Sequence, residues 1–177
     1  RRRCGGPRHP KAFAMDMLAH QSGRMQRLLD LVDHRGRAAV ERLVETIAAP
    51  MVSTAEHTLA LLFAVTKHLP HHVARAQQGL KGEPVGRALE LDGRTLGLVG
   101  IGRIATRVAI AAEALGMRVL AADPGVASSP LPGVELVPFD QLLAESDVVS
   151  LHAPAMPSTR QMINADTLSR MRPGAYL

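Results

Sequence analysis

Gly100, Gly102 and Asp123 are the residues of this chain whose types and spacing suggest chemistry most directly. The two glycines follow the apolar run 96–99 and precede a helix-like run at 103–115. Gly100 permits a sharp turn out of a strand, and Gly102 lacks the side chain that would hold a pyrophosphate away from the backbone. A helix that starts directly afterwards points its unpaired N–H groups and its positive dipole end at such phosphates. The pattern predicts a turn that binds a dinucleotide.

Asp123 ends a second apolar run, 118–122, and lies 21 residues after Gly102. At this spacing a carboxylate accepts hydrogen bonds from the adenosine ribose hydroxyls of a bound dinucleotide, and its charge repels a 2′-phosphate. We therefore predict NAD rather than NADP as the cofactor. Ala105 takes the third small position of the turn, where helix and strand pack closely. The alternative is that Asp123 only begins a polar Asp-Pro-Gly turn.

The elements that would position these residues alternate between strand and helix. Apolar runs predict strands at 95–100, 118–122, 134–137, 147–151 and from Ala175 onward, and helical periodicity predicts helices at 103–115, 140–145 and 165–171, the second capped by Asp140. Such alternation predicts an α/β fold with a Rossmann-like, doubly wound parallel sheet. Because the sequence stops at Leu177 inside the last apolar run, we expect a fragment whose sheet is incomplete at the C-terminus.

A long helix is expected before the sheet. Ser53 and Glu56 have the spacing of a capping box, so we place the start of this helix at Ser53 and a bend or break at Pro70. Residues 1–47 show broken helical periodicity, an Arg/Gly/Pro-rich start and no strand pattern. We therefore divide the chain into an unassigned basic segment, 1–47, expected to be the least ordered part, and an NAD-binding domain, 48–177.

Charge is distributed unevenly along the 177 residues. Residues 1–47 hold ten Lys/Arg against five Asp/Glu, whereas residues 48–177 hold eleven of each, so the net charge of +5 belongs to the N-terminal segment. A basic segment can bind polyanions. With few aromatic side chains and no nucleic-acid motif, we expect a solvated face and no nucleic-acid partner.

Cysteine, histidine and hydropathy patterns exclude several other classes of protein. Cys4 is the one cysteine, which excludes an internal disulfide framework and fits a reducing, cytoplasmic compartment. No apolar run reaches the length of a membrane span, so we expect no membrane partner. His68, His71 and His72 cluster near Pro70 without a carboxylate or cysteine at ligand spacing, so we expect no metal site.

Eight sequence blocks from residue 55 onward carry a resemblance to a known family. They are residues 55–62, 90–97, 100–105, 115–119, 123–124, 151–154, 162–164 and 171–175. Their order and spacing resemble the NAD-binding domain of the D-isomer-specific 2-hydroxyacid dehydrogenases. The resemblance implies an enzyme that transfers a hydride between NAD(H) and a 2-hydroxy or 2-oxo acid, and a homodimer when complete.

The resemblance also implies which residues hold the cofactor. Arg103 and Ile104 would contact the pyrophosphate through their backbone, and Asp123 would hold the adenosine ribose. The whole implied set is Gly100, Gly102, Arg103, Ile104, Asp123, His152, Ala153, Pro154 and Thr159.

His152 is the residue most easily mistaken for a catalytic base, since moving the hydroxyl proton of a substrate calls for an imidazole. Its motif position resembles a cofactor-lining residue of the family, so we expect a strand-end histidine with a structural hydrogen bond. The family's catalytic arginine, glutamate and histidine would all lie beyond Leu177, so we expect no catalytic residue in this sequence and no turnover by this chain alone. Two alternatives are another Rossmann dehydrogenase and a non-catalytic, NAD-sensing module similar to the family's corepressor branch.

Overall fold

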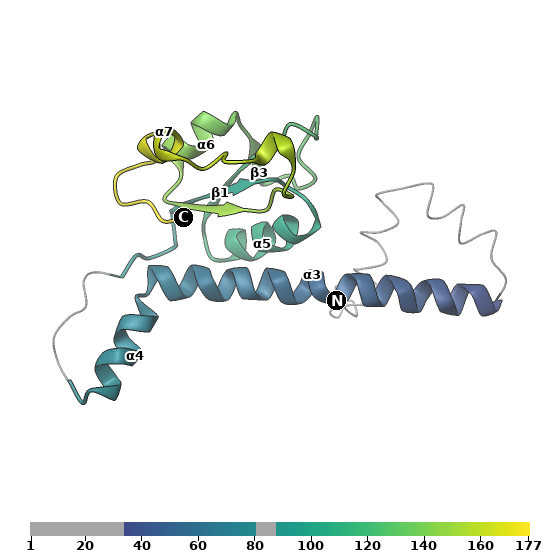
Figure 1. Ribbon diagram of the computed structural model, residues 1–177, viewed down its shortest axis with the longest axis horizontal. Coiled ribbons are helices and arrows are strands. Elements are labelled where there is room, and N and C mark those ends of the chain that lie inside the picture. The colour runs from purple at the N-terminus through teal and green to yellow at the C-terminus, as the bar shows by residue number, and fades with distance from the viewer. Residues whose placement is uncertain (1–33, 81–87) are drawn as a thin grey trace, which may run out of the picture. The chain divides into compact units, whose positions relative to one another are not determined.

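The structure, a computed structural model, describes residues 34–80 and 88–177, and side chains from Pro50 onward within these ranges (Figure 1). Our expectations for residues 1–33 and 81–87 lie outside the described residues. The chain divides into two compact units, Arg1–Pro50 and Met51–Leu177. The described residues of the first unit are helical, and the second unit contains the sheet. The functional division that we place at residue 48 stays a prediction.

Four parallel strands form the sheet: β1 (Thr95–Val99), β2 (Arg118–Ala122), β3 (Val134–Leu136) and β4 (Val148–Leu151). Their order is β3-β2-β1-β4, and Leu98 of β1 lies between Ala121 of β2 and Ser150 of β4. The winding reverses beside β1, which confirms the predicted doubly wound parallel sheet. The strand expected from Ala175 onward is represented by a single parallel bridge between Val148 and Tyr176.

Helices cover both faces of this sheet (Figure 1). Helix α5 (Arg103–Ala114) packs on β1 and β2 together with the C-terminal half of α3 (His34–Thr66). Helix α6 (Phe139–Glu145) covers the opposite face, with α7 (Ala165–Ser169) beside it. Helix α4 (Leu69–Gln77) follows α3, and a short 3-10 helix, η1 (Pro157–Thr159), follows β4. None of the helices that the structure describes has the length and apolar character needed to cross a membrane.

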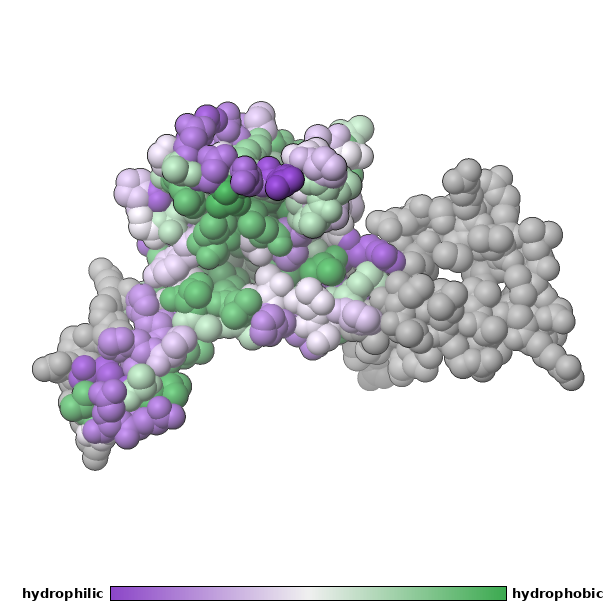
Figure 2. Space-filling view, in the orientation of Figure 1, coloured by the Kyte–Doolittle hydropathy of each residue, from purple (hydrophilic) through white to green (hydrophobic). Residues whose placement is uncertain are grey.

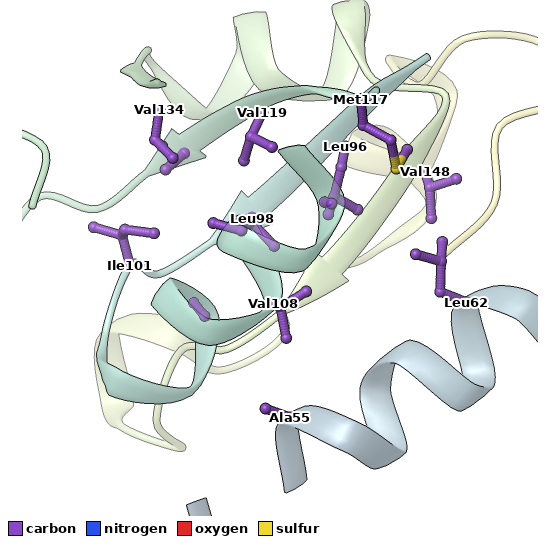
Figure 3. Close-up of a cluster of buried hydrophobic side chains, with 14 of the residues drawn as sticks. Ala55, Leu62, Leu96, Leu98, Ile101, Val108, Met117, Val119, Val134 and Val148 are labelled. Carbon is purple, nitrogen blue, oxygen red and sulfur yellow. The ribbon is translucent and has the colours of Figure 1, made fainter. Parts of the chain in front are cut away.

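Each face of the sheet has its own apolar cluster. The first joins Leu96, Leu98, Val119 and Val148 of the strands to Val108 of α5 and to Ala55 and Leu62, which project toward them from α3 (Figure 3). The second joins Val99, Leu120 and Val149 to Leu142 and Leu143 of α6. Burial on both faces stabilises the sheet, and because the strands are parallel, their carboxyl ends meet at one edge of it.

Helix α3 corrects the predicted start at Ser53. It runs from His34 through Pro50 to Thr66, so Ser53 and Glu56 lie inside the helix with exposed side chains. Because the helix continues upstream, the N–H groups that a cap would serve already face the carbonyls of the preceding turn. The capping-box pattern is therefore present but unused.

The break expected near Pro70 is confirmed. Helix α3 ends at Thr66, and α4 starts at Leu69. Between them His68 has a left-handed φ of 51°, and Pro70 lies in the first turn of α4. Proline fits this position because the N–H that it lacks would have had no partner there.

Asp140 is not the cap of α6, contrary to prediction. The N-cap position is Pro138, which offers no side-chain acceptor, and the helix begins at Phe139. Asp140 lies in the first turn, where its Oδ1 accepts a hydrogen bond of 2.8 Å from Nη1 of Arg170. A carboxylate there still interacts favourably with the helix dipole.

Candidate cofactor site

The glycine turn joins β1 to α5 at the carboxyl edge of the sheet. Gly100 has a φ of +92°, which favours glycine, and its N–H donates to the Ala122 carbonyl at 2.8 Å. Gly102 is the N-cap of α5, and its carbonyl accepts hydrogen bonds from the N–H and the hydroxyl of Thr106, each at 2.9 Å. No side chain caps the helix. The first N–H groups of α5, from Arg103 and Ile104 onward, are therefore available to a ligand.

The outer side of Gly102 is open space. A Cβ atom at Gly102 would meet nothing within 4 Å. Its φ of −75° is one that any residue adopts, so the backbone itself does not demand glycine here. The missing side chain leaves an open space in front of the α5 N-terminus, which we call the cradle. The residues present fit the diphosphate of a dinucleotide, whose negative charge the helix end attracts.

Asp123 links the end of β2 to this turn. Its Oδ2 accepts a hydrogen bond of 3.0 Å from the Ile101 N–H, and its Oδ1 accepts one of 2.8 Å from the Gly125 N–H. The bond to Gly125 is the polar turn that we considered as an alternative, but that turn does not account for the bond to Ile101. Each carboxylate oxygen keeps a further lone pair, so both can also accept hydrogen bonds from ribose hydroxyls.

His152 and Ala153 bring the end of β4 to the same turn. The His152 N–H donates to the Val99 carbonyl at 2.8 Å, and a Cβ at Gly100 would lie 3.1 Å from the backbone of both residues. The imidazole Nε2 lies 3.0 Å from Oγ of Ser150. Burial lowers the pKa of His152, because desolvation disfavours the charged imidazolium. The expected structural hydrogen bond is confirmed.

Pro154 and Thr159 close the loop that follows β4. The Thr159 hydroxyl donates to the Pro154 carbonyl at 2.7 Å and accepts a hydrogen bond of 2.9 Å from the Met156 N–H. The structure therefore brings together Gly100, Gly102, Asp123, His152 and Ala153, whereas Thr159 hydrogen-bonds to Pro154 in the loop that follows. Of the two residues that open α5, Ile104 packs partly against the core and Arg103 is half-buried.

Sequence reasoning missed two residues of this arrangement. Ile101 supplies the N–H that holds Asp123, and Ser150 supplies the hydroxyl beside His152. The signal for Ser150 was present, because residues two apart on a strand share a face. Ile101 acts through its backbone, and no side-chain pattern reports that.

An apolar groove elsewhere on the molecule is a poor match for a dinucleotide. It runs between α3 and the edge of β4 and is lined by Leu61, Val65, Val148, Ser150, Leu151 and Tyr176 among others, with no charged side chain (Figure 2). A diphosphate requires N–H donors or positive charge, which the glycine turn offers and this groove lacks. Among the described residues, no group of three or more His, Cys, Asp or Glu side chains is arranged to hold a metal ion.

Known proteins resemble this chain over the same region. A hydroxypyruvate reductase of Thermotoga maritima is 36% identical over 136 residues, which are 77% of this chain and 44% of that protein. The crystal structure of D-lactate dehydrogenase from Aquifex aeolicus, complexed with NAD and lactic acid, matches with 40% identity and a TM-score of 0.66 over 71% of this chain and 38% of that one. An acyclic imino acid reductase in complex with NADPH and D-Arg matches with 34% identity and a TM-score of 0.64 over 68% of this chain and 39% of that one.

The chain thus spans less than half the length of each of these proteins. Residues 59–177 match the family model for the NAD-binding domain of D-isomer specific 2-hydroxyacid dehydrogenases. This range contains all four strands, the glycine turn and Asp123. The chain belongs to the D-isomer specific 2-hydroxyacid dehydrogenase family and contains its NAD-binding domain.

Proposed function

We propose that this chain supplies the NAD-binding part of an enzyme that interconverts a 2-hydroxy acid and a 2-oxo acid. The observation that carries the proposal is Asp123, held by the Ile101 N–H beside an open glycine turn. The relatives named above are a hydroxypyruvate reductase and a dehydrogenase solved with NAD and lactic acid, and both names indicate such acids. That these relatives are enzymes favours this function over a non-catalytic NAD-sensing module.

Each residue of the site has a proposed part in holding NAD(H). The backbone of Gly100, Gly102, Arg103 and Ile104 binds the pyrophosphate at the α5 N-terminus. Asp123 accepts hydrogen bonds from the adenosine ribose. His152, Ala153, Pro154 and Thr159 line the path of the cofactor beyond the turn, from β4 onward. Bound NAD(H) would give or take the hydride, while these residues fix its position.

The partners and the compartment are proposed on the same basis. We propose a 2-hydroxy or 2-oxo acid as the substrate of the complete protein, a homodimer as its assembly and the cytoplasm as its location, with no nucleic-acid partner. Sedimentation of the complete protein tests the dimer. Binding of the protein to labelled polyanions tests the absence of a nucleic-acid partner. Binding that is lost when salt is raised indicates diffuse charge attraction, and binding that persists indicates a specific site.

Cofactor choice gives the first prediction. NAD(H) should bind this chain more tightly than NADP(H), by about tenfold or more, because the Asp123 carboxylate accepts from the ribose and repels a 2′-phosphate. Asp123→Asn should narrow the gap, mainly by improving NADP(H) binding, because the amide oxygen still accepts a hydrogen bond and the charge is gone. Titration calorimetry with both cofactors measures the four affinities.

A matched control removes an equal charge elsewhere. Asp166 lies exposed on α7, and Asp166→Asn should leave the preference unchanged. Equal affinities for NAD(H) and NADP(H) in the unaltered chain would contradict the role of Asp123. The imino acid reductase, which has a similar fold, was solved with NADPH, so the fold alone does not decide between NAD(H) and NADP(H).

A further inference from the structure

Ser150 and His152 form a side-chain pair that the proposed cofactor contacts do not explain. They lie two residues apart at the end of β4, and Oγ of Ser150 is 3.0 Å from Nε2 of His152. Ser150 also lines the apolar groove beside α3. Ser150 is therefore the member of the pair that lies beside the groove.

The backbone of His152 is fixed independently of this pair. Its N–H donates to the Val99 carbonyl, and its carbonyl carbon and oxygen lie 3.1 Å from the position of a Cβ on Gly100. The backbone that carries the imidazole is therefore held in place beside the glycine turn. What the backbone leaves undetermined is the rotation of the ring and which nitrogen carries the proton.

Counting donors and acceptors distinguishes the two neutral forms of the ring. Among the described residues, Nδ1 of His152 has no hydrogen-bond partner. Every fully buried side-chain nitrogen or oxygen of these residues does have a partner, so Nδ1 is not fully buried and reaches solvent. If Nε2 carries the proton, it donates to Oγ, and the Ser150 hydroxyl proton faces a mostly apolar groove. If Nδ1 carries the proton, Ser150 donates to Nε2, and Nδ1–H faces solvent or a ligand. The second form keeps the hydroxyl proton on a ring nitrogen, whereas the first turns it toward a groove lined mainly by apolar side chains.

We infer that Ser150 is a positioning residue, whose hydroxyl donates to Nε2 of His152 and thereby presents a neutral Nδ1–H at the carboxyl ends of β1 and β4. The ligand class that such a donor takes is an oxygen acceptor of the bound dinucleotide, and this part rests on the proposed function. Burial of the ring, which lowers the pKa of His152, agrees with a neutral imidazole.

The tautomer is measured directly on the 177-residue chain. Long-range ¹H–¹⁵N correlation spectra of the histidine-labelled chain at about pH 7.5 distinguish the two forms, and His152→Gln identifies the signal of this ring. We expect Nδ1–H in the unaltered chain, a shift toward Nε2–H in Ser150→Ala and restoration in Ser150→Thr, which keeps a hydroxyl. Thr58→Val is the matched control, because it removes another hydroxyl from the same groove, one that donates to the Thr54 carbonyl. An Nε2–H ring in the unaltered chain, or the same form after Ser150→Ala, would overturn the inference.

NADH binding tests the consequence for the ligand. Ser150→Ala should weaken binding by about fivefold, the change expected for one misdirected hydrogen bond, and Ser150→Thr and Thr58→Val should bind as the parent does. Circular dichroism confirms that each variant is folded. Unchanged NADH binding in Ser150→Ala, with the tautomer altered, would overturn the ligand contact. No NADH binding by the unaltered chain would contradict the proposed function instead, while the spectra still decide whether Ser150 sets the ring.

Discussion

Gly97, Gly100 and Gly102 lie within one short stretch, and each is glycine for a different physical reason. A Cβ on Gly97 would run into Oγ of Ser146 and would lie 2.6 Å from Cδ2 of Leu142, so this glycine lets α6 approach β1. Gly100 has a positive φ and touches the end of β4. Gly102 has ordinary dihedral angles and open space beside it. Packing and backbone shape explain the first two, and the diphosphate of the proposed cofactor would explain the third.

Gly102→Ala therefore separates folding from cofactor binding. The free energy of unfolding should stay within about 0.5 kcal/mol of the parent, because the added methyl group meets no atom. NADH binding should weaken by about tenfold or more, because the methyl group occupies the diphosphate cradle. Urea unfolding and titration calorimetry measure the two quantities.

Gly97→Ala is the contrasting variant in the same experiment. It should lower the free energy of unfolding by about 2 kcal/mol, because α6 must move away from β1. Normal NADH binding by Gly102→Ala would show that the cradle does not hold the diphosphate.

Burial of His152 gives a prediction for the pH dependence of stability. Because burial lowers the pKa of this ring in the folded state, the unfolded chain binds the proton first as pH falls. The free energy of unfolding should therefore decrease as the pH falls below the ordinary histidine pKa of about 6.5. Above this pH, the stabilisation contributed by the neutral His152 ring should be fully present. Urea unfolding at several values between about pH 7.5 and 5 should show a shallower decrease for His152→Gln. His57→Gln, at an exposed position of α3, should keep the slope of the parent, and equal slopes in all three proteins would contradict the prediction.

The elements of the sheet were predictable because several local signals agree there. Strand β2 matches the predicted range 118–122, and β1 and β4 differ from prediction by one residue at an end. Each of these strands is an apolar run bounded by a turn residue, and burial on both faces requires that pattern. The glycine turn and Asp123 follow from the strand ends, so their proximity could also be inferred.

Helix starts were less predictable because a cap is a local preference that the surrounding chain can override. Ser53 and Glu56 carry the capping pattern, but the chain before them is helical as well. Asp140 is a good cap residue, yet α6 starts at Phe139. The Ser150–His152 pair was missed for another reason, since choosing among the neighbours on a strand face requires knowing which side chains reach each other.

Charges in the described part of the second unit are arranged differently at the two ends of the sheet. At the amino ends of the strands, Asp147 accepts from the Thr95 N–H at 2.9 Å and pairs with Arg94 and Arg172. Arg118 pairs there with Glu135 and Glu145. At the carboxyl ends lie Asp123 and the uncapped start of α5. The amino edge thus satisfies its own charges, while the carboxyl edge offers donors and one carboxylate to a ligand.

This layout leads to the prediction for the molecule as a whole, that the 177-residue chain binds NADH without oxidising it at a useful rate. Hydride transfer to a 2-oxo acid needs a group that supplies a proton and a cation that orients the carboxylate, and a positioned acid or base contributes about 10²–10⁴-fold in rate. None of the ion pairs among the described residues includes a histidine. His152 is hydrogen-bonded to Ser150, and burial lowers its pKa, which disfavours the protonated ring that a proton donor requires.

NADH absorbance in the presence of glyoxylate, pyruvate or hydroxypyruvate should therefore fall no faster with the chain than with buffer, even where calorimetry shows the cofactor bound. A longer protein that supplies an acid and a carboxylate-binding cation should be active, and in it Gly102→Ala should raise the KM for NADH. Rapid oxidation by the 177-residue chain, abolished by His152→Ala while calorimetry still shows NADH bound to that variant, and retained by His57→Ala, would identify His152 as the proton donor. That result would also contradict the ring orientation inferred here, because a neutral Nδ1–H reserved for the cofactor cannot at the same time protonate the substrate.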